Sequence, residues 1–354
     1  MVDDYDFKTL NKVEEGGENW TYFSQRNENS YMIGDGRTVI VFENGQEIFK
    51  GEIAAYEDVT YSRSAECYFI AQKNFIYKKE INATAPSPFF KLSSPCHTSS
   101  KNVILSCEAN KKLLVLQEGL KISVINPFNA KKEVTLEFDK ITRVVDFLLI
   151  GESQDSFAVL GECNHILLFD SHLKKALEGK SYYLCHRING PAWQLKVMFT
   201  SCPRGQYLLV VTGMRSRRSF QQQHTLRTIK ITEEGLENVS DVQESFPGEY
   251  ATSDEINHPD YLVIPNTSLS CVGYKSDQLL CLTFSETDPR VRECEEEWDV
   301  RMLRFDGKKN KWEQVFGVVF VSRLYDVFQR FGEDLYSVRY DGHVQRLSLK
   351  FSPM

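Results

Sequence analysis

The sequence predicts an all-β fold built from one repeated unit of four strands. Short apolar runs separated by turns recur along the 354 residues, while the apolar spacing typical of amphipathic helices is nearly absent. The aromatic share of 12%, dominated by phenylalanine and tyrosine, suits packed sheets. Hydrophobic residues make up 42% of the chain and charged residues 26%, which is ordinary for a folded protein and excludes a largely disordered or fibrous one.

The repeat is most visible as a pair of strands. An apolar run, a short turn and a second apolar run follow one another, and the second run often ends in an aromatic residue and an acid. In the first copy, Tyr31-Met32-Ile33-Gly34 precedes the run from Thr38 to Glu43. The seven pairs span residues 31–43, 67–77, 113–125, 157–170, 207–229, 279–306 and 335–349.

Each pair has a weaker apolar run on either side, as at 103–107 and 134–138 around the third pair. Four strands per unit at a period of roughly 40–50 residues are typical of a β-propeller blade. We therefore predict a single seven-bladed β-propeller domain over residues 1–354, with four-stranded antiparallel blades. The predicted blades are 17–53, 54–92, 101–139, 141–185, 192–243, 268–317 and 322–351, the last completed by 5–13.

The N-terminal run 5–10 alternates apolar and polar residues and precedes the first unit, whereas the seventh unit ends at Phe351 without a fourth strand. We expect this N-terminal strand to close the last blade. Closure would remove the unpaired strand edges at the two ends of the array.

The strand order, the period and the terminal overlap resemble a seven-bladed WD40-type propeller with divergent repeats, over nearly the whole chain. The dipeptide that ends the third strand in this family occurs in softened form as Phe42-Glu43, Phe169-Asp170 and Phe305-Asp306. The resemblance implies that loops joining second to third strands, and loops joining one blade to the next, lie on one common face.

Three insertions in the fifth and sixth units would lie on that face. The enlarged loop 214–223 is basic, the loop 286–297 is acidic, and the connection 241–268 joins the two units. Long loops in compact domains are usually functional or disordered. The predicted partner-binding residues are Arg215, Arg217, Arg218, Phe220, Tyr250, Tyr261, Glu293, Glu295, Glu296 and Glu297. The arginine loop could contact a protein, the phosphates of RNA or the neighbouring acidic loop, or be a solvated turn.

No motif for catalysis appears in the sequence. Nucleophile elbows, HExxH, phosphate-binding glycine loops and EF-hands are absent, and the seven histidines show no ligand spacing. We expect no catalytic residue, metal or cofactor, and thus no enzyme.

Charge and cysteine usage bound the compartment and the partners. The net charge of −7 does not favour nucleic acid as a partner, and nine scattered cysteines without a CxxC pair suit a reducing environment. The acidic N-terminus lacks signal-peptide order, and no apolar run is long enough to cross a membrane.

These features predict an intracellular protein, cytoplasmic or nuclear and not secreted or inserted in a membrane. They favour a non-catalytic scaffold subunit that binds other proteins of a larger complex. Two alternatives remain: an RNA-associated subunit of a ribonucleoprotein, and a propeller enzyme with a metal bound in its channel.

Overall fold

The computed structural model confirms the all-β fold and divides the chain into two compact units. Unit 1 comprises Met1–Ala176 and Leu324–Met354, and unit 2 comprises Leu177–Arg323. The structure describes residues 2–13, 22–35, 37–52, 56–96, 103–108, 110–139, 141, 143–151, 154–161, 165–180, 192–201, 207–216, 222–244, 268–274, 278–286, 297–306, 311–321, 327–331, 334–338 and 342–351.

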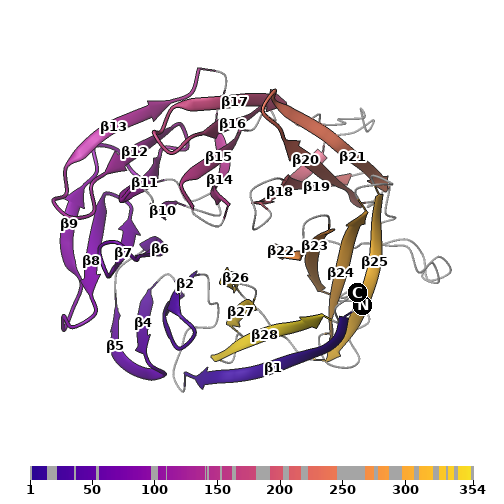
Figure 1. Cartoon of the computed structure of the whole chain (residues 1–354). Coiled ribbons are helices and arrows are strands. Elements are labelled where there is room, and N and C mark those ends of the chain that lie inside the picture. The colour runs from indigo at the N-terminus through magenta and orange to yellow at the C-terminus, as the bar shows by residue number, and fades with distance from the viewer. Residues whose placement is uncertain are drawn as a thin grey trace. The chain divides into compact units, whose positions relative to one another are not determined.

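Within these residues the strands form seven four-stranded antiparallel sheets (Figure 1). Sheet 1 holds β2 (Tyr22–Asn27), β3 (Ser30–Gly34), β4 (Thr38–Glu43) and β5 (Gln46–Glu52). Sheet 2 holds β6 (Tyr56–Ser62), β7 (Cys67–Gln72), β8 (Phe75–Glu80) and β9 (Ser87–Lys91). Sheet 3 holds β10 (Ile104–Cys107), β11 (Lys112–Gln117), β12 (Lys121–Ile125) and β13 (Lys132–Glu137).

The remaining sheets follow the same strand order. Sheet 4 holds β14 (Val144–Ile150), β15 (Ser156–Gly161), β16 (His165–Phe169) and β17 (Lys175–Lys180). Sheet 5 holds β18 (Ala192–Ser201), β19 (Tyr207–Ser216), β20 (Gln222–Ile231) and β21 (Leu236–Glu244). Sheet 6 holds β22 (Ser268–Tyr274), β23 (Gln278–Glu286), β24 (Glu297–Asp306) and β25 (Lys311–Val321). Sheet 7 combines β1 (Val2–Lys12) with β26 (Val327–Phe331), β27 (Asp334–Val338) and β28 (His343–Phe351).

The N-terminal strand β1 is the outer strand of sheet 7. It runs antiparallel to β28, from the pair Val2 and Phe351 to the pair Lys12 and His343 (Figure 1). Beyond β1, the backbone N–H of Val13 donates to the carbonyl of Gly342 at 3.0 Å. The two ends of the sequence therefore meet in one sheet.

Apolar side chains on both faces of the middle strands explain why the sheets stack. The whole of β3 is buried, and so are the last five residues of β11, whereas the outer strand β13 is mostly exposed. A strand that is buried on both faces needs a packed sheet on each side, at a typical spacing of about 10 Å between stacked sheets. The continuous apolar runs of the sequence thus form the middle strands, which are buried between stacked sheets.

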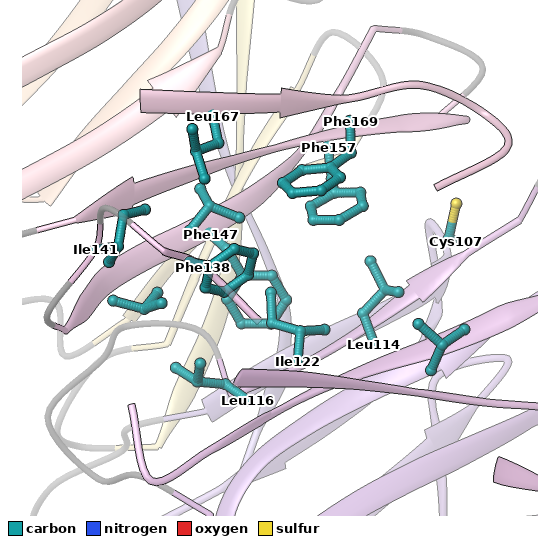
Figure 2. Close-up of a cluster of buried hydrophobic side chains, with 13 residues drawn as sticks. Cys107, Leu114, Leu116, Ile122, Phe138, Ile141, Phe147, Phe157, Leu167 and Phe169 are labelled. Carbon is teal, nitrogen blue, oxygen red and sulfur yellow. The ribbon is translucent and has the colours of Figure 1, made fainter. Parts of the chain in front are cut away.

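Four apolar clusters in unit 1 join its five sheets in the order 7, 1, 2, 3 and 4. The cluster between sheets 3 and 4 contains Leu114 and Ile122 from sheet 3 and Phe147 from sheet 4 (Figure 2). In the same cluster the rings of Phe157 and Phe169 stack, with centroids 4.6 Å apart and an interplanar angle of 5°.

Candidate functional site

Two of the predicted partner-binding residues lie in strands. Arg215 is the penultimate residue of β19 and pairs with Gln222 of β20. Glu297 is the first residue of β24 and pairs with Val321 of β25. The other eight lie outside the described residues: Arg217, Arg218, Phe220, Tyr250, Tyr261, Glu293, Glu295 and Glu296.

The predicted loops 214–223 and 286–297 are too wide, because residues 214–216, 222–223, 286 and 297 are strand. Strands β19 and β20 have 10 residues each, whereas β15 and β16 in sheet 4 have 6 and 5. The four additional residues of β19 lengthen that strand by about 13 Å. Residues at the base of each insertion are therefore paired strand, because backbone pairing with neighbouring strands does not require an apolar sequence.

These two long hairpins lie at the same end of adjacent sheets of unit 2. In each antiparallel sheet, the turns after the first and third strands lie at one end, which we name the first-turn end. The turn after the second strand lies at the other, the second-turn end. The rings of Tyr207 and Phe305 meet near the first-turn end of sheets 5 and 6, with centroids 6.1 Å apart. Arg215 and Glu297 lie on the second-turn end of these sheets. This end thus holds one basic and one acidic residue of the predicted set, Arg215 and Glu297.

In unit 1, charged residues at the first-turn end connect one sheet to the next. Arg346 of sheet 7 forms ion pairs with Asp334 at 2.7 Å and with Glu28 of sheet 1 at 3.0 Å. Arg26 of sheet 1 pairs with Glu43 and lies over the ring of Tyr61 in sheet 2, 5.9 Å from its centroid. These charged groups are therefore paired with other groups of the protein.

The next two junctions use hydrogen bonds at the same end. The Glu108 carboxylate of sheet 3 accepts from the backbone N–H groups of Arg63 and Ser64 in sheet 2, at 2.9 and 2.8 Å. The Cys107 thiol donates to the carbonyl of Gln154 in sheet 4 at 3.2 Å. Polar residues here stabilise the stack and are poor candidates for binding a partner.

At the second-turn end of unit 1, backbone groups cross between sheets. The N–H of Cys96 donates to the carbonyl of Lys73 at 2.7 Å, and the side-chain amide of Gln117 donates to the carbonyl of Ser94 at 2.9 Å. The N–H of Val144 donates to the carbonyl of Gly119 at 2.6 Å. The residues of these connections that the structure describes are therefore bonded to neighbouring turns.

A buried carboxyl group, Asp58 of β6, joins sheets 2 and 3. Its Oδ2 accepts from the backbone N–H groups of Val103 and Ile104 at 2.8 and 3.1 Å, and its Oδ1 accepts from Val59 at 2.8 Å. Burial raises the pKa of Asp58 to about 7, the hydrogen bonds oppose this rise, and the charge of Asp146 adds to it. Sequence reasoning missed this residue because nothing local marks it.

A buried ammonium group, Lys79 of β8, also serves the fold. Its Nζ donates to the carbonyls of Glu80 and Ala83, each at 2.9 Å, and lies 5.2 Å from the ring centroid of Phe49 in sheet 1. Burial lowers the pKa of Lys79. The carbonyl of Ile81 is a third acceptor at 3.4 Å, so each of the three N–H donors of this ammonium group has an acceptor.

The described thiols and acids offer no reactive arrangement. Burial raises the pKa of Cys67 and of Cys96 to about 12, so both thiols stay protonated at neutral pH. Over the described part of the chain, no group of three or more His, Cys, Asp or Glu residues is placed to hold a metal ion. No helix that could span a membrane occurs among those residues either.

Comparison with known proteins identifies the fold. No protein-family model and no curated protein matches the sequence. Among solved structures, the chain is similar to the β-propeller domain of Nup133 from Vanderwaltozyma polyspora, with a TM-score of 0.64 and 8% identity, covering 99% of this chain and 98% of that one.

Two further structures agree. BBS1N, solved in complex with ARL6DN, gives a TM-score of 0.55 at 11% identity over 99% of this chain and 97% of its own. The β-propeller domain of Myceliophteria thermophila Cps50 (Swd1) gives 0.54 at 10% identity, over 98% and 100%. The chain therefore has a β-propeller fold, as the repeat predicted.

Proposed function

We propose that this chain is a non-catalytic scaffold subunit that binds other proteins within a larger intracellular assembly. The second-turn end of sheets 5 and 6 is its main docking surface. One observation carries the proposal: the strands of sheets 5 and 6 extend toward this end beyond the strand lengths of sheets 1 to 4. The strands of sheets 1 to 4 have between 4 and 7 residues, whereas β19, β20 and β24 have 10 each and β25 has 11.

A closed seven-bladed ring is the architecture we infer for this scaffold, with β1 closing the last blade. Seven four-stranded sheets among the described residues and the pairing of β1 with β28 support it. In a closed ring the first and last blades cover each other, so no blade face is left open. Additions at the second-turn end can then bind a partner without weakening the framework.

The charge of the chain and a similar solved structure favour protein binding over the two alternatives. The similar BBS1 domain was solved in complex with a protein, ARL6DN. The segments beyond β19 and β23 are both charged, and charged segments increase association rate and specificity when a partner carries the complementary charge. A negative net charge of −7 disfavours a general affinity for RNA.

The test compares partner recovery from the native cell by affinity purification with quantitative mass spectrometry. One variant neutralises Arg215, Arg217 and Arg218 to Ala, and a second lacks residues 287–296, between β23 and β24. We expect each variant to lose the same subset of partners. The matched control changes Lys308, Lys309 and Lys311 to Ala, in the sequence between β24 and β25 and at the first residue of β25, which removes the same charge and should retain every partner.

Unchanged recovery in both variants would overturn the docking surface. Crosslinking to RNA in cells that is lost with the three arginines would favour the ribonucleoprotein alternative. A stoichiometric metal in the purified protein would favour the propeller enzyme.

A further inference from the structure

The turn between β12 and β13 displays an aromatic side chain to solvent. Phe128 is 54% exposed, the highest value among the large exposed hydrophobic residues of the described chain. It follows Pro127 in residues 126–131, which we name the Phe128 turn. A single exposed aromatic residue is common on protein surfaces, so the exposure of Phe128 gains meaning only from the residues around it.

Hydrogen bonds hold the Phe128 turn in one conformation. The Oδ1 of Asn126 accepts from the N–H of Phe128 at 2.9 Å, and the carbonyl of Asn126 accepts from the N–H of Ala130 at 3.1 Å. The N–H of Asn126 donates to the carbonyl of Lys131 at 2.9 Å, and Asn129 Oδ1 accepts from Lys131 at 3.0 Å. The ring of Phe128 is thus presented by a rigid support, so little conformational entropy is lost when it binds.

Lysines surround this ring on two neighbouring turns. Lys131 ends the Phe128 turn and Lys132 begins β13, and both are exposed; Lys111 is exposed on the first turn of the same sheet. The two turns lie side by side, because Lys112 beside Lys111 forms an ion pair with Glu133 beside Lys132. Among the described residues, no ion pair includes Lys111, Lys131 or Lys132.

Two acids lie near these lysines, and one of them, Glu133, is itself exposed and interacts electrostatically with Lys131. The carboxylate of Glu108 accepts hydrogen bonds from Arg63, Ser64 and Ser106, and that of Glu133 pairs with Lys112. A chain with a net charge of −7 therefore presents a local positive surface around one apolar ring. We name Lys111, Phe128, Lys131 and Lys132 the basic tip.

We propose that the basic tip is a peripheral contact for an anionic lipid surface. Its lysines attract acidic headgroups, while the ring of Phe128 enters the boundary between headgroups and acyl chains. Lysine has a compact charge on a long apolar stem, which suits diffuse attraction to a charged surface.

Two other partner classes fit the basic tip less well. Lysine is depleted from protein–protein interfaces, where Arg, Tyr and Trp are enriched. RNA readers use arginine forks and side-chain amides, but the amide oxygens of Asn126 and Asn129 are already bonded within the turn. Contact with a lipid surface needs no such readout.

Vesicle co-sedimentation of the full chain tests the proposal. We expect binding to phosphatidylcholine vesicles that contain about 30% phosphatidylserine, and almost none to phosphatidylcholine alone. The variant K131E/K132E should lower the partition coefficient at least 20-fold, at roughly fivefold or more per lysine. Phe128→Ala should lower it by about fivefold, through lost burial of the ring.

Matched variants separate the tip from net charge and from general hydrophobicity. K50E/K91E makes the same charge change on the outer strands of sheets 1 and 2, and Ile48→Ala shortens another exposed apolar residue, 42% exposed. Both should bind as the wild type does. Phe128→Trp should retain binding and shift its fluorescence to shorter wavelength with anionic vesicles only.

Each other outcome overturns the proposal. Equal losses in K131E/K132E and K50E/K91E would make the attraction a net-charge effect. Equal binding to both vesicle types would remove the role of the lysines. If vesicles do not bind but a labelled single-stranded RNA, or a glutamate-rich peptide, binds and is lost with K131E/K132E, the tip recognises that class instead. Partner recovery through sheets 5 and 6 is independent of all these results.

Discussion

At the scale of single residues, the junctions between sheets depend on polar groups that the sequence does not reveal. Asp58 stands in an ordinary strand sequence, yet its carboxyl group accepts three backbone N–H bonds, two of them from sheet 3. A local shift in the pairing of β6 with β7 lies between Tyr56 and Asp58. The function of this residue arises from the neighbouring sheet, so only the assembled fold exposes it.

Asp58→Asn should lower the free energy of unfolding by about 1–3 kcal/mol. An amide offers one oxygen where the carboxyl group offers two, so either Val59 or the pair Val103 and Ile104 loses its acceptor. Urea unfolding of the wild type and the variant, followed by circular dichroism, measures the loss. Equal midpoints in the two proteins would contradict the role of Asp58 in joining the sheets.

The raised pKa of Asp58 also predicts how the stability difference between the wild type and D58N changes with pH. Burial raises the pKa of Asp58 to about 7, while aspartate in an unfolded chain titrates near 3.9. The folded state holds this proton more tightly, so the group stabilises the fold fully below about pH 4, and this contribution is lost as the pH rises to about 7. The stability difference between wild type and D58N should narrow over that window, and a difference that widens would contradict the assignment.

At the scale of elements, the sequence predicted where strands exist better than how far they extend. The buried core of β3 or β11 is an apolar run that any pattern search finds. The ends of β19 and β20 are polar, as in Arg215 and Gln222, and they remain strand because each pairs with the other. Pairing is a property of two segments, which one-dimensional periodicity cannot measure.

One glycine holds the N-terminal element against sheet 7. Gly342 has φ +80°, and a Cβ atom built on it would lie 2.5 Å from the carbonyl oxygen of Val13. Gly342→Ala should therefore cost about 1–2 kcal/mol for the left-handed backbone and more for displacing Val13. The control is Gly45→Ala, with φ +78° and no atom within 4 Å, which isolates the backbone cost. Equal destabilisation of the two variants in urea would show that the close approach carries no weight.

At the scale of the whole molecule, the period of the repeat was the most informative feature of the sequence. It predicted four-stranded sheets and a propeller fold because each blade must bury both faces of its middle strands, which forces every unit to carry the same apolar runs. The predicted partner-binding residues do not follow from the period of the repeat. They lie where the repeat is broken, and only Arg215 and Glu297 among them are within described strands.

The pairing of the two ends of the chain makes a prediction about the whole fold. Thr9 faces Gln345 across β1 and β28, and their side chains meet at 3.4 Å although they are 336 positions apart. The variant T9C/Q345C should form an intramolecular disulfide that raises stability by at most about 5 kcal/mol, because it closes nearly the entire chain. The control T38C/E52C links an ordinary pair across β4 and β5, whose short loop limits the gain to about 3 kcal/mol.

Melting temperatures with and without reductant measure both gains. Because it closes the longer loop, the first crosslink should stabilise more than the second. A disulfide that forms without raising the melting temperature would contradict closure by β1, and failure of the disulfide to form would contradict the register.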